Sequence, residues 1–134
     1  MDALFERARA ALAAHGSDVS TWWVPGRLEF LGKHTDYCGG PSLLCAVELG
    51  LAVASALRSD ARVRVVDAVS GERAEAELSD NIDVRQGHWS SYPFTVCRRV
   101  ARNFPKARRG IDLAFASTLP PAAGLRGRPR GRTR

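Results

Sequence analysis

The chain has 134 residues, of which 45% are hydrophobic and 25% are charged, and this composition is typical of one globular domain with a short tail. The length excludes a two-domain dehydrogenase, and no run approaches the ~20 apolar residues of a membrane helix. The net charge of +6 comes mostly from the segment RGRPRGRTR, residues 126–134, which holds five arginines and no acid. A polyanionic partner is therefore suggested for the tail and not for the body.

Apolar spacing along the chain predicts two helices and several strands. The helices are expected over residues 2–15 and 88–104, where apolar residues recur every three or four positions. An extended segment begins at Trp22 and is interrupted by a Pro-Gly pair, and alternation predicts further strands over residues 62–69, 72–78 and 110–118. Residues 42–58 are predicted as two buried strands that turn near Gly50. This order of elements is typical of an α+β fold with an antiparallel or mixed sheet.

The cysteines and histidines predict no metal site. The three cysteines, Cys38, Cys45 and Cys97, form an odd set without metal-ligand spacing, and the histidines lie far apart in the sequence. Reduced thiols of this kind are typical of a cytoplasmic protein. Charged residues among the apolar ones at the N-terminus favour an amphipathic helix over a signal peptide, and no membrane partner is expected.

Most of the chemistry-bearing side chains lie in one short segment, PGRLEFLGKHTDYCGG, residues 25–40. A strand followed by glycine-rich turns can direct several polar side chains into one concave site. A carboxylate such as Asp36 accepts two hydrogen bonds from a vicinal diol, and Arg27 is suited to stabilising charge on a transferred phosphoryl group. The alternative is a polar surface loop with an ordinary contact between Asp36 and His34.

The same segment resembles the galactokinase signature, a G-R-x-N-x-I-G-E-H-x-D-Y-N-G-G pattern preceded by proline. Two further features agree in order: Trp89 and Tyr92 resemble a W-x-x-Y helix of that family, and residues 119–125, LPPAAGL, resemble the opening of its phosphate-binding motif. The resemblance covers residues 2–125 and indicates the GHMP superfamily of small-molecule kinases. It implies an incomplete N-terminal domain of the ribosomal protein S5 domain 2-like type, with helices on one side of the sheet.

The resemblance also implies roles for individual residues. Arg27 would be catalytic, near the transferred phosphate and the base. The sugar would be bound by the residues that follow it in the signature: Lys33, His34, Asp36, Tyr37, Gly39 and Gly40. Gly124 and Leu125 would begin the loop whose backbone amides hold the ATP phosphates at a helix N-terminus. The implied reaction transfers the γ-phosphoryl group of ATP, with Mg²⁺, to the anomeric hydroxyl of galactose or a related sugar.

The sequence departs from the family pattern in three respects. Lys33 stands where the family has an acidic sugar ligand, and a lysine donates hydrogen bonds but accepts none. Glu29 and Cys38 stand in place of asparagines. After Leu125 the serines of the phosphate loop are replaced, and the family's catalytic aspartate has no counterpart. We therefore expect a truncated domain over residues 1–125, a basic disordered tail over 126–134 that is read out of frame, and no phosphoryl transfer by the chain alone.

Two other functions are compatible with the sequence. Residues 126–131, RGRPRG, match the core of an AT-hook, in which arginines enter a narrow A·T minor groove. Five arginines within nine residues often produce such a match by chance, so nucleic acid is not the expected partner. A non-catalytic sugar-binding regulator is the other alternative, because His34, Asp36 and Tyr37 are retained.

Overall fold

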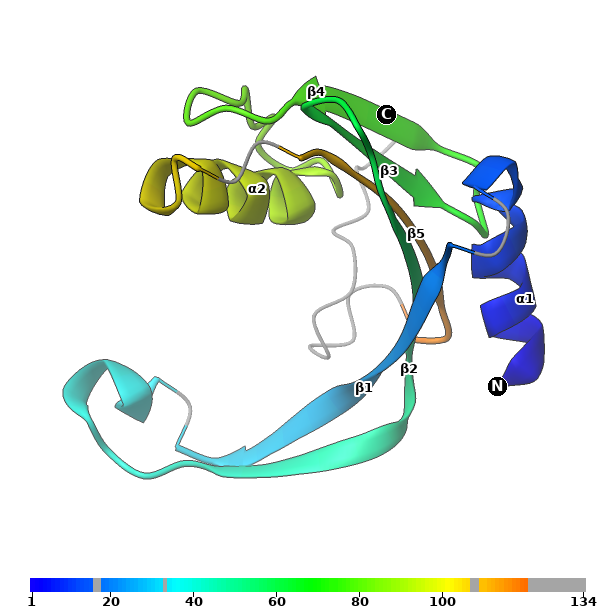
Figure 1. The fold of residues 1–134 in the computed structure, drawn as a ribbon. Helices are drawn as coiled ribbons and strands as arrows, with labels where there is room; N and C mark the ends of the chain where they lie inside the picture. Colours follow the sequence, from blue (N-terminus) through cyan, green and yellow to red (C-terminus); the bar gives the residue numbers. More distant parts are fainter. Residues whose placement is uncertain (16–17, 33, 107–108, 121–134) are drawn as a thin grey trace, which may run out of the picture.

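Five strands lie side by side in one curved sheet of the computed structural model, which describes residues 1–15, 18–32, 34–106 and 109–120 (Figure 1). They are β1 (Ser20–Leu31), β2 (Leu43–Leu57), β3 (Arg62–Asp67), β4 (Arg73–Glu77) and β5 (Ile111–Ser117), in the order β1-β2-β5-β3-β4. Strands β3 and β5 pair in parallel and the other neighbours pair antiparallel, so the predicted α+β class with a mixed sheet is confirmed. Two short 3₁₀ turns, η1 (Ala13–His15) and η2 (Thr35–Cys38), accompany the sheet.

The two α-helices, α1 (Asp2–Ala10) and α2 (Ser91–Asn103), pack on opposite faces of the sheet. Strand β5 shows why, since Ala114 packs in one buried cluster with Ala8 of α1, whereas Leu113 and Phe115 pack in another with Phe94 of α2. Successive residues of a strand point to opposite faces, so a strand with buried apolar residues at successive positions needs cover on both faces. The expectation of helices on one side of the sheet is therefore wrong.

Strands β1 and β2 continue beyond the sheet as a two-stranded ribbon (Figure 1). Strand β5 pairs with β2 only along Leu51–Leu57, so residues 43–50 have β1 as their neighbour among the described strands. We call residues 25–50, which comprise this ribbon and the loop at its end, the arm. Most of the described residues of the arm are exposed, in contrast with the buried alanines of the sheet.

The predicted turn near Gly50 is wrong, because β2 is one continuous strand of 15 residues. Gly50 N donates to Thr118 Oγ1 at 3.1 Å, and Thr118 N donates to Gly50 O at 3.0 Å, which ties this point of β2 to the end of β5. A Cβ atom on Gly50 would lie 2.8 Å from the ring of Trp23. Glycine at this position therefore permits a close approach of strands and not a change of direction.

Other local expectations agree with the structure. Residues 72–78, whose alanines and glutamates also favour a helix, contain β4, and this strand follows a turn with Gly71 at φ +76°. Helix α2 ends before Pro105, as expected for a residue that lacks an N–H. The pair Pro25-Gly26 does not end β1, and the register with β2 shifts there instead. No helix in the described parts of the chain is long and apolar enough to cross a membrane.

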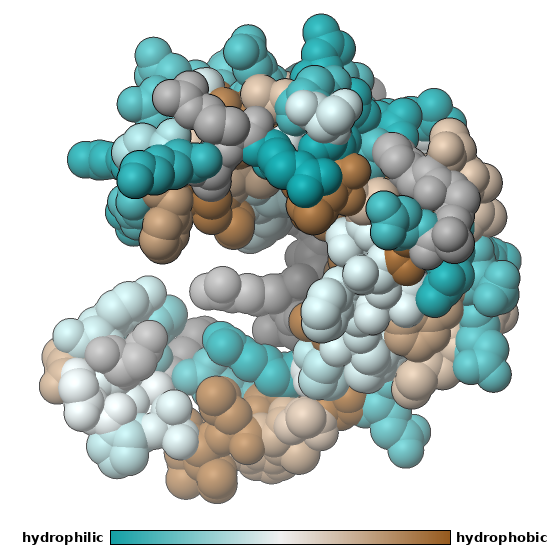
Figure 2. Space-filling model, in the orientation of Figure 1, coloured by the Kyte–Doolittle hydropathy of each residue, from teal (hydrophilic) through white to brown (hydrophobic). Residues whose placement is uncertain are grey.

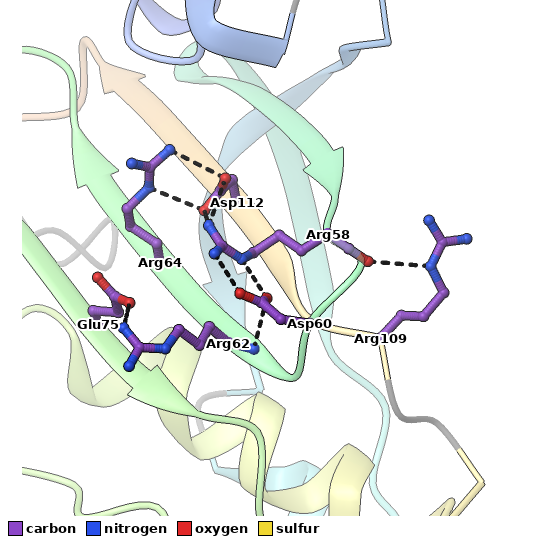
Figure 3. A network of polar contacts seen from close by, with 7 residues as sticks. All are labelled: Arg58, Asp60, Arg62, Arg64, Glu75, Arg109 and Asp112. Atoms are coloured by element: carbon purple, nitrogen blue, oxygen red, sulfur yellow. Dashed lines mark hydrogen bonds and ion pairs between the residues drawn. The ribbon is translucent and has the colours of Figure 1, made fainter.

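A fully buried carboxylate, Asp112 of β5, is held by two arginines (Figure 3). Arg58 Nη1 donates to its two oxygens at 3.0 and 3.1 Å, and Arg64 donates through Nε and Nη2 at the same two distances. The arginine side chains stay 22% and 29% exposed, so their charges reach solvent while the carboxylate does not. Asp112 lies on the same face of β5 as Ala114, and the arginine stems there continue the cover that α1 provides.

Arg58 also binds a second carboxylate, that of Asp60 (Figure 3). Its Nε and Nη2 atoms donate to the two oxygens of Asp60 at 2.6 Å each, and Arg62 N donates to one of them at 3.1 Å. These hydrogen bonds hold the pKa of Asp60 well below its ordinary value, and they raise the pKa of Arg58 above its own. Arg58 thus joins an exposed and a buried carboxylate at one end of the sheet.

Candidate functional site

The tip of the arm is a tight loop closed by Thr35. Thr35 N donates to Gly32 O at 3.0 Å, and Gly40 N donates to Thr35 O at 2.8 Å. The Thr35 hydroxyl lies 2.7 Å from Gly32 O and 3.0 Å from Pro41 O, so it can donate to either carbonyl. Gly32 has φ +89°, and a Cβ atom there would lie 2.6 Å from Pro41 O. Thr35 is absent from the residues expected from the sequence, although a threonine between glycines signals this kind of turn.

Two of the expected sugar-binding residues, His34 and Tyr37, lie together at this tip. Their rings are stacked, with centroids 5.6 Å apart and planes 8° apart. His34 has φ +68°, a left-handed conformation that few residues other than glycine adopt. Tyr37 is 79% exposed, and His34 is exposed as well. The pair presents two flat rings with polar edges to solvent, which is the kind of surface that packs against a sugar ring.

The remaining described residues of the expected sugar set belong to the same loop. Asp36 lies within η2, Gly39 has φ +70°, and Gly40 supplies the amide that closes the loop on Thr35. A Cβ atom on Gly40 would lie 3.0 Å from the Thr35 side chain, so a larger residue would press on the closure. Lys33 lies outside the described residues. The structure thus brings together every described member of the set.

Arg27 lies on the two-stranded ribbon of the arm and not in the loop at its tip. It is exposed on β1 opposite Ala46 of β2, and alternation places it on the same face of the ribbon as Glu29. Leu31 lies four positions further along the strand, a distance of about 13 Å along the ribbon. The expected catalytic arginine and the stacked rings at the tip are therefore two separate parts of the arm.

The end of β5 reaches the arm beside Arg27. Gly26 is buried, and a Cβ atom on it would lie 2.6 Å from the side chain of Leu119. Leu119 is the first residue of the segment expected to open the phosphate loop, so this segment begins against Gly26, the neighbour of Arg27 in the chain. Gly124 and Leu125, the two residues expected to contact phosphates, lie outside the described residues.

A hollow separates the arm from the part of the molecule that carries α2, and hydrophobic surface borders it on the α2 side (Figure 2). Trp89, which precedes α2, is 7% exposed and packs against Phe115 with ring centroids 5.6 Å apart. Its indole Nε1 is buried and has no hydrogen-bond partner among the described residues. Tyr92, by contrast, is 60% exposed. Trp89 thus belongs to the buried cluster beneath α2, and Tyr92 is the member of the expected W-x-x-Y pair that faces solvent.

The described residues do not form a magnesium site by themselves. No group of three or more His, Cys, Asp or Glu side chains in the described parts of the chain is placed to share a metal ion. Proteins hold Mg²⁺ mainly through one or two carboxylates and the phosphates of a substrate, and near Arg27 on β1 the candidate carboxylate is Glu29.

Comparisons with known proteins agree with this geometry. The family described as the galactokinase galactose-binding signature matches residues 13–57, which include β1, the arm tip and β2. The galactokinase of Actinobacillus pleuropneumoniae serotype 5b is 34% identical over 109 residues, which are 81% of this chain and 28% of that protein. The galactokinase of Haemophilus influenzae strain PittEE is 30% identical over 105 residues, which are 78% of this chain and 27% of that protein.

Solved structures share the fold. The Lactococcus lactis galactokinase complexed with galactose matches 94% of this chain and 33% of its own, with a TM-score of 0.75 and 24% identity. The Methanococcus jannaschii mevalonate kinase matches 81% and 35%, with a TM-score of 0.63 and 12% identity. At 24% and 12% identity, these two structures show that the fold is shared. By the signature over residues 13–57 and by its relatives, the chain is a galactokinase-like N-terminal region.

The chain spans 28% of the length of the curated relative from Actinobacillus. The catalytic activity and substrates of whole galactokinases are therefore matters for proposal in this chain. The comparisons give no support to the DNA-binding alternative. The AT-hook-like residues 126–131 lie outside the described residues.

Proposed function

We propose that this chain forms the sugar-binding part of a galactokinase-type active site. An active site of this type transfers a phosphoryl group from ATP to the anomeric hydroxyl of galactose or a related sugar. The observation that supports the proposal is the arm, because the galactose-binding signature coincides with its ribbon and with the loop that Thr35 closes. The Lactococcus lactis protein of the same fold was crystallised with galactose, which agrees with this reading.

In this proposal the arm tip binds the sugar. The carboxylate of Asp36 accepts hydrogen bonds from two neighbouring hydroxyls, and the His34 ring donates or accepts one according to its tautomer. Tyr37 and the Gly39-Gly40 turn form the wall of the site. Lys33 adds a donor where the family pattern has an acceptor, so the hydroxyl that it meets must accept. The identity of the preferred sugar therefore depends on Lys33 more than on its neighbours.

The proposed reaction forms a bond between the anomeric oxygen and the γ-phosphorus of ATP, and it breaks the bond from that phosphorus to ADP. The hydroxyl proton passes to a base, for which no residue of this chain matches the family pattern. Arg27 follows Gly26, against which the segment expected to hold phosphates begins, and in this proposal its permanent charge stabilises phosphoryl oxygens. Mg²⁺ carried by ATP supplies further charge neutralisation when it is bound.

Titration with sugars tests this proposal. Galactose added to the full chain should shift the NMR signals of His34 and Tyr37 and release heat in calorimetry, whereas glucose, which differs in one hydroxyl orientation, should bind more weakly. Tyr37→Ala should weaken galactose binding roughly tenfold, because the stacked wall is lost. Phe104→Ala, at an aromatic residue that is 64% exposed at the end of α2, is the matched control and should bind normally. Unchanged spectra and no heat with the unaltered chain would contradict the proposal.

We also propose a cytoplasmic location and a domain limit at residue 125. Cys38, Cys45 and Cys97 are free thiols, as expected in a reducing compartment. The limit between residues 1–125 and 126–134 is supported by the change to an arginine- and glycine-rich sequence. Both sides of that limit lie outside the described residues.

A further inference from the structure

The outer face of α2 carries an arginine cluster that the proposed function does not use. Thr95, Arg98, Arg99 and Arg102 occupy positions i, i+3, i+4 and i+7 of the helix, so they share one face. Helix α2 contains no acidic residue, and like charges four residues apart, as at Arg98 and Arg102, repel each other. A counter-charge from elsewhere would relieve this repulsion.

The cluster lines a cavity of about 430 Å³ together with Asp80, which comes from the loop after β4. None of the three arginines forms an ion pair or hydrogen bond with the residues that the structure describes, whereas every arginine in Figure 3 contacts a carboxylate or a carbonyl. The named lining carries three positive charges and one negative charge. The cavity therefore has an uncompensated positive charge of the kind that attracts an anion.

We propose that this cavity binds a small molecule through a phosphate group. Guanidinium groups present paired N–H donors that match phosphate oxygens in bidentate contacts, and the hydroxyl of Thr95 adds one donor at the edge. The hollow is partly open to solvent and its volume falls within the range of ligand pockets, so a phosphate that carries an organic group has room to enter. A nucleoside phosphate and a sugar phosphate share this chemistry.

The distribution of charged side chains around the cavity favours a small ligand over an extended polyanion. Nucleic acids and similar polymers are bound along stripes of positive charge that follow their backbone. Here the charge is confined to one face of α2, and the carboxylate of Asp80 stands in the same lining. A polymer passing over the cavity would meet that carboxylate, whereas a phosphate monoester can seat its oxygens among the arginines.

Calorimetry on the full chain tests the proposal with inorganic phosphate, ADP and galactose 1-phosphate, and with adenosine and galactose as unphosphorylated controls. The double variant R98Q/R102Q should lower the affinity for the phosphorylated ligands roughly tenfold, because two charge-assisted contacts are lost. The matched control R7Q/R73Q removes two exposed arginines from α1 and β4 and should bind normally. All variants keep residues 121–134, so the arginines of the tail contribute equally, and circular dichroism checks that each variant is folded.

A second pair of variants tests the sign of the local charge. Asp80→Asn removes the negative charge of the lining and should strengthen binding, whereas Asp83→Asn, at an exposed aspartate three residues later, should not. Equal losses in R98Q/R102Q and R7Q/R73Q would show general charge attraction and overturn the proposal, as would no binding by the unaltered chain. Heparin binding that exceeds every small phosphate and disappears in R98Q/R102Q would assign the cluster to a polyanion instead.

Discussion

At the scale of single residues, the carboxylate of Asp112 is a fully buried charge in the middle of the sheet. Asp112 is fully buried on the central strand β5, and its two oxygens accept four hydrogen bonds from Arg58 and Arg64. A buried carboxylate is stable only when such donors replace its hydration. The parallel register places Arg64 directly beside Asp112, so the pairing of β3 with β5 and this ion pair support each other.

We expect Asp112→Asn to lower the free energy of unfolding by about 3 kcal/mol, because it leaves arginine donors without their charged acceptor. The partial exposure of both arginines keeps the loss from being larger. Urea unfolding measures the effect. Glu75→Gln breaks the ion pair with Arg62, in which the Glu75 side chain is 43% exposed, and should change stability by less than about 1 kcal/mol. Equal effects of the two substitutions would show that burial of Asp112 is unimportant.

At the scale of elements, helix α2 has three faces with different environments. Phe94 is buried against the sheet, and the arginine cluster lines the cavity with Asp80. A third stripe, Tyr92, Val96 and Val100, repeats every four residues and is apolar yet exposed. A stripe of this kind promotes association with another apolar surface.

Replacing the exposed stripe by V96Q/V100Q should reduce self-association of the chain and leave its stability unchanged within about 0.5 kcal/mol, because Val96 is already 62% exposed. Sedimentation velocity reports the association, and thermal unfolding reports the stability. Phe94→Ala is the contrasting substitution, since Phe94 is 6% exposed and its loss should cost about 3–4 kcal/mol. A stability loss in V96Q/V100Q as large as in Phe94→Ala would mean that the stripe is part of the core.

At the scale of the whole molecule, the arm and α2 stand on either side of a hollow (Figure 2). The proposed sugar-binding loop lies at the tip of the arm, while Leu119 lies against Gly26 at its base. The relatives continue well beyond the part that this chain matches. The proposed site therefore contains sugar-binding and phosphate-facing residues but no residue matched to the base.

We expect no turnover of galactose and ATP by the 134-residue chain alone, because a proton acceptor matched to the family is missing. A coupled assay for ADP release measures this, with the Actinobacillus pleuropneumoniae galactokinase as the positive control. Arg27→Ala serves as the second control. Activity that persists in Arg27→Ala is a contaminant, whereas activity that the unaltered chain shows and Arg27→Ala loses would refute the expectation.

The loop at the tip of the arm could be predicted from local sequence. The signature segment, residues 25–40, predicts a loop that gathers His34, Asp36, Tyr37 and the two glycines, and hydrogen bonds within that segment are what close it. The α+β class was predicted from the periodicity of apolar residues. The end of α2 before Pro105 was predicted because proline has no N–H. In each case the residues that decide the structure are neighbours in the chain.

The tertiary structure decided what depends on distant partners. From local sequence Gly50 predicts a turn, whereas in the structure it accommodates the end of β5. The helices pack on opposite faces of the sheet because β5 has buried apolar residues on both of its faces. Leu119 meets Gly26 beside Arg27 only because β5 pairs with β2. The sequence by itself therefore determined the galactokinase resemblance and the loop at the tip of the arm, through short-range turns and motifs. Strand order and the layers of helices were decided by long-range burial, because contacts between residues far apart leave no local pattern.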